Sequence, residues 1–450
     1  MKTQTATAAQ TLAEFALNLQ YSQIPANVIE RAKACVIDTV GACTYGSTLP
    51  WSKIVIAYAE QYGKGGNSTI LGTGRKVHAP YAALANGALA HAFEMDCLVQ
   101  PSAGVHPGAS LTAPGLAVAQ EIDATGKDFL TALVAGGEVM HRIGDASKQS
   151  TEHIGFHAPG VTGVFGGAVV AGRLFKLNAE QMTNALGISG SLCSGLLEFS
   201  KSGGGMVKRL HLGRAAESGV LAATLAKNGF SGPATVLEGK FGYMNVFCHE
   251  GDAARMTAGL GEVWKLLTLT LKRYSCHVTA HVPVTAALEL KDKHMIAGDD
   301  VASITVAGSE KMVSHHNIPE PQDMTMAQYS TPFCVALAFY LNPRDPNAFS
   351  EESRNNEKIR ALCRNVKVEL RKETNKDNPL ASRVTVKLKD GREFTQDLTH
   401  FPGMPQQPLD HDQLREKFTT ITRGVLGTGV EKVFSDLSAL EKVVKMRELI

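Results

Sequence analysis

The sequence predicts a mainly helical protein: a large all-helical domain formed by both chain ends, with a smaller α+β domain inserted between them. Apolar residues recur at helical spacing through an Ala- and Gly-rich first half. Strand-like alternation begins only after Lys272, and amphipathic helix returns from Asp412. A chain of 450 residues is also too long for one ordinary core. We place the helical domain at 1–271 and 401–450 and the α+β domain at 272–400.

The helices of the first half are predicted from their apolar faces and from their start and stop signals. Pro25 is a good helix-start residue, and Ile29, Val36 and Val40 recur after it at helical spacing. Gly229 ends a later helix in a sequence typical of a C-terminal cap. Because Ala- and Gly-rich helices can approach closely, we expect a compact body. Similar apolar faces predict helices at 82–92, 111–120, 129–139, 161–174 and 215–228.

The α+β domain is predicted from short alternating segments. A hairpin is expected where residues 382–388 and 393–395 flank an Asp390-Gly391 turn. Two further strands are expected at 301–306 and 366–370, and helical patterns lie between the strands at 284–291, 332–341 and 357–364.

Composition excludes several classes of protein. Hydrophobic residues at 44% and charged residues at 20% are ordinary for a globular protein, and a net charge of +2 provides no basic field for nucleic acid or an anionic membrane. No apolar run approaches the ~18 residues of a membrane span, and the N-terminus lacks a secretory apolar core. Eight singly spaced cysteines predict reduced, mostly buried thiols. We therefore expect a soluble cytoplasmic protein.

The first chemically informative segment carries His91, Glu94 and Asp96, followed by His106 before Pro107. On a helix, His91 and Glu94 would share a face, and Asp96 would lie off it. His106 would stand just before a helix start, where an imidazole is well presented and backbone N–H groups can hold a carboxylate. The alternative is a helix end with capping carboxylates.

Two further segments place ionisable residues at helix mouths. His157 lies in a short loop that opens an apolar helix, and the alternative for it is a capping histidine. A triple glycine lacks Walker spacing and precedes Lys208, Arg209 and His211, which we place at the mouth of a helix beginning near Gly213. These cationic side chains suit an anionic, polycarboxylate substrate, although such a cluster is also typical of a solvated basic face.

The fourth segment runs from Lys272 to His281 at the predicted domain boundary, where small molecules often bind. Cys276, His277 and His281 resemble zinc ligands, but no second close pair with zinc-type spacing accompanies them. We therefore expect neither a metal nor an organic cofactor.

These segments, in this order, resemble the MmgE/PrpD family of 2-methylcitrate dehydratases, cis-aconitate decarboxylases and iminodisuccinate epimerases. The resemblance covers nearly the whole chain. Beyond the four segments it includes residues 327–336, 401–405 and 414–418.

The resemblance implies a helical domain made from both chain ends, a small α+β lid domain, a homodimer and a cofactor-independent site in the cleft. It implies His106, His157, Lys208 and His281 as the catalytic set. Residues 328 and 329 of the lid are expected to face the same cleft. The full set of expected substrate contacts is His91, Glu94, Asp96, Arg209, Gln328 and Tyr329.

One stretch departs from the family pattern. Where the decarboxylases have a motif of Asp-Phe-Asp-Asp-Thr type, this chain has Glu94-Met95-Asp96-Cys97-Leu98. Glu94 lengthens a carboxylate by one methylene, and Leu98 removes a hydroxyl donor. The expected substrate is therefore not necessarily the best-known one of the family.

The function that follows is a lyase of dehydratase or decarboxylase type, acting on a small di- or tricarboxylate by proton transfer at carbon next to a carboxylate. His106 or His157 supplies a base of near-neutral pKa, Lys208 anchors the carboxylate and stabilises charge, and His281 is a second acid or contact. Lys208 could instead be the base. Three further functions stay open: an epimerase of a dicarboxylate of iminodisuccinate type, a non-catalytic carboxylate-binding protein, and a structural helical scaffold.

Overall fold

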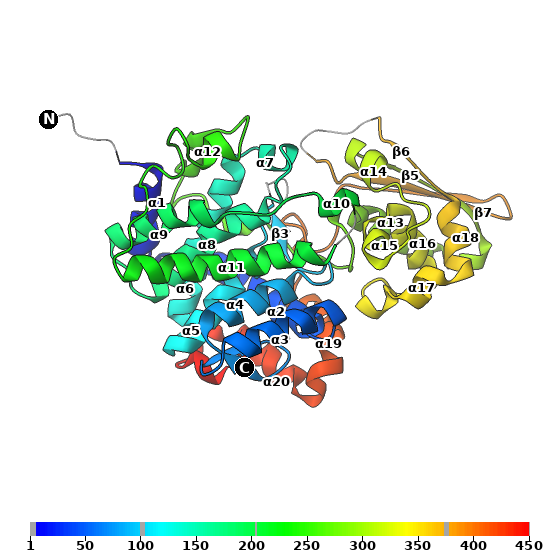
Figure 1. Ribbon diagram of the computed structural model, residues 1–450. Helices are drawn as coiled ribbons and strands as arrows, with labels where there is room; N and C mark the ends of the chain where they lie inside the picture. Colours follow the sequence, from blue (N-terminus) through cyan, green and yellow to red (C-terminus); the bar gives the residue numbers. More distant parts are fainter. Residues whose placement is uncertain (1–5, 100–103, 203–204, 373–377, 450) are drawn as a thin grey trace. The chain divides into compact units, whose positions relative to one another are not determined.

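The structure is a computed structural model that describes residues 6–99, 104–202, 205–372 and 378–449 (Figure 1). Two glycines of the triple glycine, Gly203 and Gly204, lie outside these residues. The chain forms two compact units. The first unit contains Met1–Ala92, Asp96–Thr270 and Leu414–Ile450, and the second contains Phe93–Met95 and Leu271–Gln413. The domain boundaries predicted from the sequence, 1–271 with 401–450 and 272–400, remain a proposal.

The first unit is mainly helical. In the part that the structure describes, its helices are α1 (Ala8–Asn18), α2 (Ala26–Gly46), α3 (Pro50–Tyr62), α4 (Ala79–Ala90), α5 (Ala113–Ile122), α6 (Gly126–Ala146), α7 (Ser150–His153), α8 (Pro159–Leu174), α9 (Ala179–Leu192), α10 (Phe199–Ser202), α11 (Met206–Lys227), α12 (Tyr243–Val246), α19 (His411–Leu426, of which the part from Leu414 belongs to this unit) and α20 (Val430–Ser438).

Helix α11 packs against α4 and α8. Two glycines make the crossing with α4 possible. A Cβ at Gly87 would lie 2.9 Å from the carbonyl oxygen of Leu212, and one at Gly213 would lie 2.4 Å from that of Leu84. Because both obstacles are backbone atoms, neither position can take a side chain without moving a helix. The close crossing brings the first turns of α11 near the end of α4.

Two small antiparallel sheets interrupt the helices of the first unit. One joins β1 (Ser68–Ile70) to β2 (Arg75–Val77), and the other joins β3 (Leu98–Val99) to β4 (Leu269–Thr270). The expectation of a wholly helical body is wrong in this detail, because strands of two or three residues are too short to show alternation. The coarser expectation, a mainly helical chain, is confirmed.

The second unit contains a four-stranded mixed sheet in the order β6-β5-β7-β8. Strand β5 (Val301–Gly308) is parallel to β6 (Val366–Leu370) and antiparallel to β7 (Ser382–Leu388), which pairs with β8 (Glu393–Leu398). These are the four predicted strands, although β8 runs three residues further. The helices described in this unit are α13 (His281–His294), α14 (Glu310–His315), α15 (Met324–Tyr329), α16 (Thr331–Tyr340), α17 (Glu351–Asn355) and α18 (Glu357–Arg364).

Two predicted helix ends are wrong, and both bear on the candidate site. Helix α11 begins at Met206, not near Gly213, so Lys208 lies in its first turn. Helix α4 ends at Ala90, so no helical face joins His91 to later residues. Two broader expectations agree with the structure. All eight cysteines are free, seven of them buried, and no described helix is both long and apolar enough to cross a membrane.

Candidate active site

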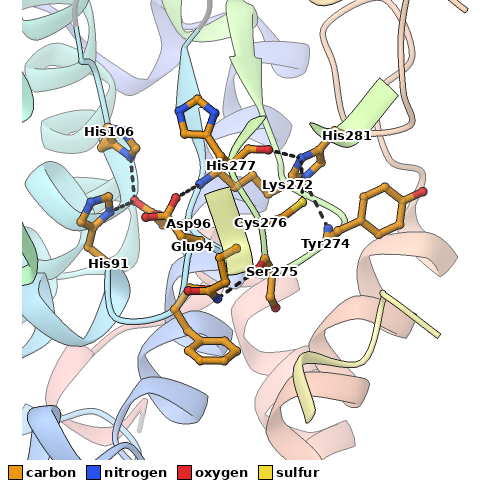
Figure 2. A network of polar contacts seen from close by, with 12 residues as sticks. His91, Glu94, Asp96, His106, Lys272, Tyr274, Ser275, Cys276, His277 and His281 are labelled. Carbon is orange, nitrogen blue, oxygen red and sulfur yellow. Dashed lines mark hydrogen bonds and ion pairs between the residues drawn. The ribbon is translucent and has the colours of Figure 1, made fainter. Parts of the chain in front are cut away.

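A carboxylate bridges two histidines in the first unit (Figure 2). Asp96 Oδ2 lies 2.9 Å from His91 Nδ1 and 2.7 Å from His106 Nδ1. Because an ionised carboxylate only accepts hydrogen bonds, each Nδ1 carries its hydrogen and donates it. In the neutral imidazoles, the lone pair is therefore on Nε2. The two rings meet edge to face, with centroids 4.9 Å apart.

The local backbone explains how these three side chains converge. His91 is the residue that follows α4, and the chain then turns back so that Asp96 directly precedes Cys97 and strand β3. The Val99 N–H donates to the Val105 carbonyl over 3.0 Å, so these two residues lie side by side. His106 precedes a π-helical turn, Gly108–Thr112, that leads into α5. The three side chains of this trio therefore meet because the chain folds back on itself, not because they share one face of a helix.

Burial and neighbouring charges shift the pKa of His91 and of Asp96. The side chains of His91 and Asp96 are each 1% exposed and that of His106 is 12% exposed. Burial, with the positive charge of Lys208, lowers the pKa of His91 well below its usual value and outweighs the opposing effect of Asp96. Burial acts to raise the pKa of Asp96, but the two neighbouring histidines and their hydrogen bonds lower it well below its usual range. Asp96 is therefore an ionised carboxylate, and His91 is a neutral imidazole.

A second histidine pair continues the cluster. His157 lies in the loop before α8, where its N–H donates to the Gly195 carbonyl over 2.9 Å. Its Nδ1 is 3.1 Å from Nδ1 of His211, so one ring donates and the other accepts. The His157 ring centroid is 6.0 Å from that of His91. Burial first, then neighbouring histidines, lowers the pKa of His157 well below its usual value, and burial together with Lys208 lowers that of His211.

The first turn of α11 supplies the cationic residues. Lys208 is 5% exposed, and its charge acts on His91 and His211. Arg209 is also buried, and its Nε donates to the carbonyl of Ala92 over 3.2 Å. The Arg209 guanidinium thus bonds the backbone beside His91, a positioning role that the sequence did not predict; whether it also contacts substrate remains a prediction.

In the second unit, Glu94 forms a buried ion pair. Its Oε2 lies 3.0 Å from Nζ of Lys272, and the two side chains are 5% and 2% exposed. Glu94 has a φ of +56°, an uncommon conformation for a residue with a Cβ. The expected helical face shared by His91 and Glu94 is therefore wrong, because the chain leaves the helix and reverses between them.

His281 is wholly buried at the start of α13. Its Nε2 accepts from the Tyr274 N–H over 3.4 Å, and its Nδ1 lies 3.6 Å from Sγ of Cys276. Burial acts to raise the pKa of Cys276, but hydrogen bonds from Cys334 and His281, with the charges of His281 and Lys272, lower it to about 5. Both nitrogens of His281 therefore have protein partners.

The more accessible histidine of this segment is His277, which we considered in the sequence only for its resemblance to a zinc ligand. Its ring stacks on His316 with centroids 4.1 Å apart and lies 4.9 Å from that of Tyr329. Gln328 is buried and its Nε2 donates to the carbonyls of Phe93 and Ser275, over 3.1 and 3.0 Å.

The structure gathers part of the predicted set in each unit. Glu94, Gln328 and His281 lie in the second unit, as does Tyr329, and the first three bond to protein groups there. His211 and His277 stand inside the selected motifs but were not in the predicted catalytic or substrate-binding set. The only indication for either residue in the sequence was its place in a motif, because spacing does not show which of two neighbouring histidines a loop exposes. The predicted residues of the first unit are His91, Asp96, His106, His157, Lys208 and Arg209.

Comparison with known proteins agrees with the sequence motifs. Residues 10–256 match the MmgE/PrpD N-terminal domain, and residues 274–440 match the MmgE/PrpD C-terminal domain. The chain belongs to the MmgE/PrpD family.

Individual MmgE/PrpD relatives are distant but nearly full length. The chain is 28% identical to cis-aconitate decarboxylase of Aspergillus terreus over 452 residues, which cover 95% of this chain and 91% of that protein. It is 27% identical to human cis-aconitate decarboxylase, covering 96% of this chain and 89% of the relative. It is 26% identical to a cis-aconitate decarboxylase-like protein of Aspergillus oryzae, covering 98% and 95%.

Proposed function

We propose that this MmgE/PrpD protein is a cofactor-independent lyase that acts on a small di- or tricarboxylate through proton transfer at carbon next to a carboxylate. The observation that carries the proposal is the buried Asp96 carboxylate bonded to His91 and His106, with Lys208 close enough to act on the same imidazole. Membership of a family that includes cis-aconitate decarboxylases supports the substrate class.

His106 is the proton-transfer residue that we favour. Asp96 holds its Nδ1–H, which fixes the ring and leaves the Nε2 lone pair for a substrate proton. His106 is also the most exposed of the trio, at 12% against 1% for its two partners. When Nε2 takes a proton, the carboxylate 2.7 Å from Nδ1 stabilises the imidazolium.

Lys208 supplies the positive charge. Removing a proton, or carbon dioxide, next to a carboxylate leaves an electron pair that spreads onto the carboxylate oxygens, so a fixed cation lowers the barrier. The same charge disfavours protonation of His91 and His211. Lys208 therefore stabilises the developing anion and adds to the larger effect of burial, which lowers the pKa of both neighbouring imidazoles.

His157 completes the proposed machinery as a second proton donor or acceptor. Its bond to His211 can carry a proton between the two rings, because each Nδ1 is able to donate or accept. The expectations that His281 is a second acid or substrate contact, and that Gln328 and Tyr329 contact substrate, remain proposals drawn from the family resemblance. A homodimer and a lid role for the α+β domain remain proposals drawn from the family resemblance.

Glu94 and Leu98 bear on which acid is used. The Glu94 carboxylate lies against Lys272, and Leu98 is buried in β3. A substrate group that would meet a threonine hydroxyl in the decarboxylases would meet an apolar side chain at Leu98. We therefore propose a substrate with fewer polar groups on that side than cis-aconitate has.

An epimerase is the second candidate. Two imidazoles on separate segments, His106 and His157, provide two proton-transfer groups in one cluster. An epimerase needs such a pair to remove a proton from one face of a carbon and return it to the other.

The test is proton NMR of the purified protein with citrate-, aconitate-, methylcitrate- and succinate-type acids in deuterated buffer. Elimination or decarboxylation supports the lyase, and exchange without a leaving group supports the epimerase. Lys208→Ala and His157→Ala should each lower turnover by orders of magnitude, whereas the exposed control His411→Ala should not. Absence of turnover and exchange with every acid would leave a carboxylate-binding protein, and full activity of both site variants would refute the proposed site.

A further inference from the structure

Three potential metal ligands converge in the first unit. One ring nitrogen of His91, one of His106 and a carboxylate oxygen of Asp96 all lie within 4.8 Å of one another. Both rings direct Nδ1 at the same oxygen, Oδ2 (Figure 2). All three residues stand in the first chemically informative segment, but the fold-back at β3 that brings His106 to Asp96 has no ligand-spacing signature in the sequence.

The distances are close to those of a bound transition metal. Zinc lies about 2.0 to 2.1 Å from imidazole nitrogen and about 2.0 to 2.2 Å from carboxylate oxygen, so tetrahedral ligand atoms are roughly 3.4 Å apart. The observed N···O distances are 2.9 and 2.7 Å. The imidazoles of His91 and His106 therefore have to withdraw by only about 0.5 and about 0.7 Å, respectively, to admit the ion.

A second observation comes from the other nitrogen of His91. Its Nε2 is buried and has no hydrogen-bond partner among the described residues. The ring is therefore not tied at its far side, and it can shift without breaking a second hydrogen bond. For metal binding, the hydrogen on Nδ1 moves to Nε2, so that Nδ1 offers its lone pair and the imidazole stays neutral.

The donor set indicates the class of ion. Two imidazoles and one carboxylate suit zinc, cobalt and ferrous iron, whereas magnesium prefers oxygen ligands. The positive charge of Lys208, which already acts on His91, would weaken the binding of a divalent cation by electrostatic repulsion. The opposing charge favours reversible binding over a permanently held ion.

We propose that His91, Asp96 and His106 form a binding site for a divalent transition-metal ion of the zinc class, and that its occupation inhibits the enzyme. The site rests on the geometry of the trio alone. The inhibition rests on the proposed function, since the ion would hold the Asp96 oxygen that orients His106 and convert that ring to the other tautomer.

The test measures binding and activity separately on the full chain. Zinc affinity is measured by competition with a chromophoric chelator, and cobalt is added as a spectroscopic substitute whose visible absorption reports tetrahedral coordination. His106→Asn should lower zinc affinity at least tenfold, since losing even a residue that only hydrogen-bonds a metal ligand costs about 10 to 100-fold. His411→Ala, at an exposed histidine, should leave affinity unchanged. Magnesium should not compete.

Several outcomes would overturn the proposal. Equal affinity of the wild type and His106→Asn, with circular dichroism showing both folded, would mean adventitious surface binding only. Cobalt spectra without tetrahedral bands would exclude the trio as ligands. If a chelator abolished turnover and zinc restored it, the ion would be a required cofactor and not an inhibitor. An inactive protein that still bound zinc through His106 would refute the proposed function but not the site.

Discussion

Replacing Asp96, the carboxylate that bonds both His91 and His106, tests the proposed proton transfer. Asp96→Asn keeps the shape of the side chain and an oxygen that can accept from both Nδ1–H groups, but it removes the negative charge. When His106 is protonated, the charge centres of imidazolium and carboxylate are roughly 4 Å apart, and at an effective dielectric constant of about 20 their attraction is about 4 kcal/mol. At about 1.4 kcal/mol per factor of ten, kcat/KM should fall about 10³-fold.

The assay is steady-state turnover of the acid identified by NMR, with melting temperature measured in parallel. The loss should appear in kcat, because the imidazolium forms only during the reaction. Asp145→Asn is the matched control, since that carboxylate is partly exposed and bonds Lys265; its kcat/KM should stay within about twofold of wild type. A folded Asp96→Asn variant whose kcat/KM lies within tenfold of wild type would refute the role of Asp96.

Three further predictions concern stability. Burial lowers the pKa of His141 to about 4, so the unfolded state takes up the proton first as pH drops. The free energy of unfolding should therefore fall by about 3 kcal/mol between pH of about 6.5 and about 4. Chemical denaturation of His141→Gln should show a flatter pH dependence of stability, and an unchanged dependence would contradict this. Gly213→Ala should lower the free energy of unfolding by about 1 to 3 kcal/mol, because the new Cβ forces α11 away from α4. Gly424→Ala, which has open space around it, should leave stability unchanged or raise it. Equal melting temperatures of the two variants would be inconsistent with the close crossing. Glu94→Gln should lower the free energy of unfolding by about 3 to 5 kcal/mol, because the Lys272 charge stays buried without this carboxylate. A loss of stability below about 1 kcal/mol would show that the ion pair is solvated.

The fold was largely predictable because its signals are local. The Asp390-Gly391 turn and the alternation around it predicted the β7–β8 hairpin, since a type of turn and a period of two need only a few neighbouring residues. Pro25 likewise marked the start of α2. The start of α11 was misplaced at Gly213 because a glycine usually weakens a helix; here it permits the close crossing with α4.

The candidate site was predictable as a set of residue types but not as a geometry. His106, His157 and Lys208 could be selected because ionisable residues stood at helix mouths. The bridging role of Asp96 depends on a chain reversal that left no periodic signal. The buried pairing of Glu94 depends on a partner 178 residues away, which no local pattern shows.

The most direct test of the proposed proton transfer is solvent deuterium incorporation at the carbon next to the substrate carboxylate, followed by proton NMR for the wild type and for His106→Asn. We expect incorporation by the wild type and a loss of at least about 100-fold in the variant, the usual contribution of a positioned general base. Incorporation at the wild-type rate by folded His106→Asn would contradict the claim that the imidazole held by Asp96 transfers the proton.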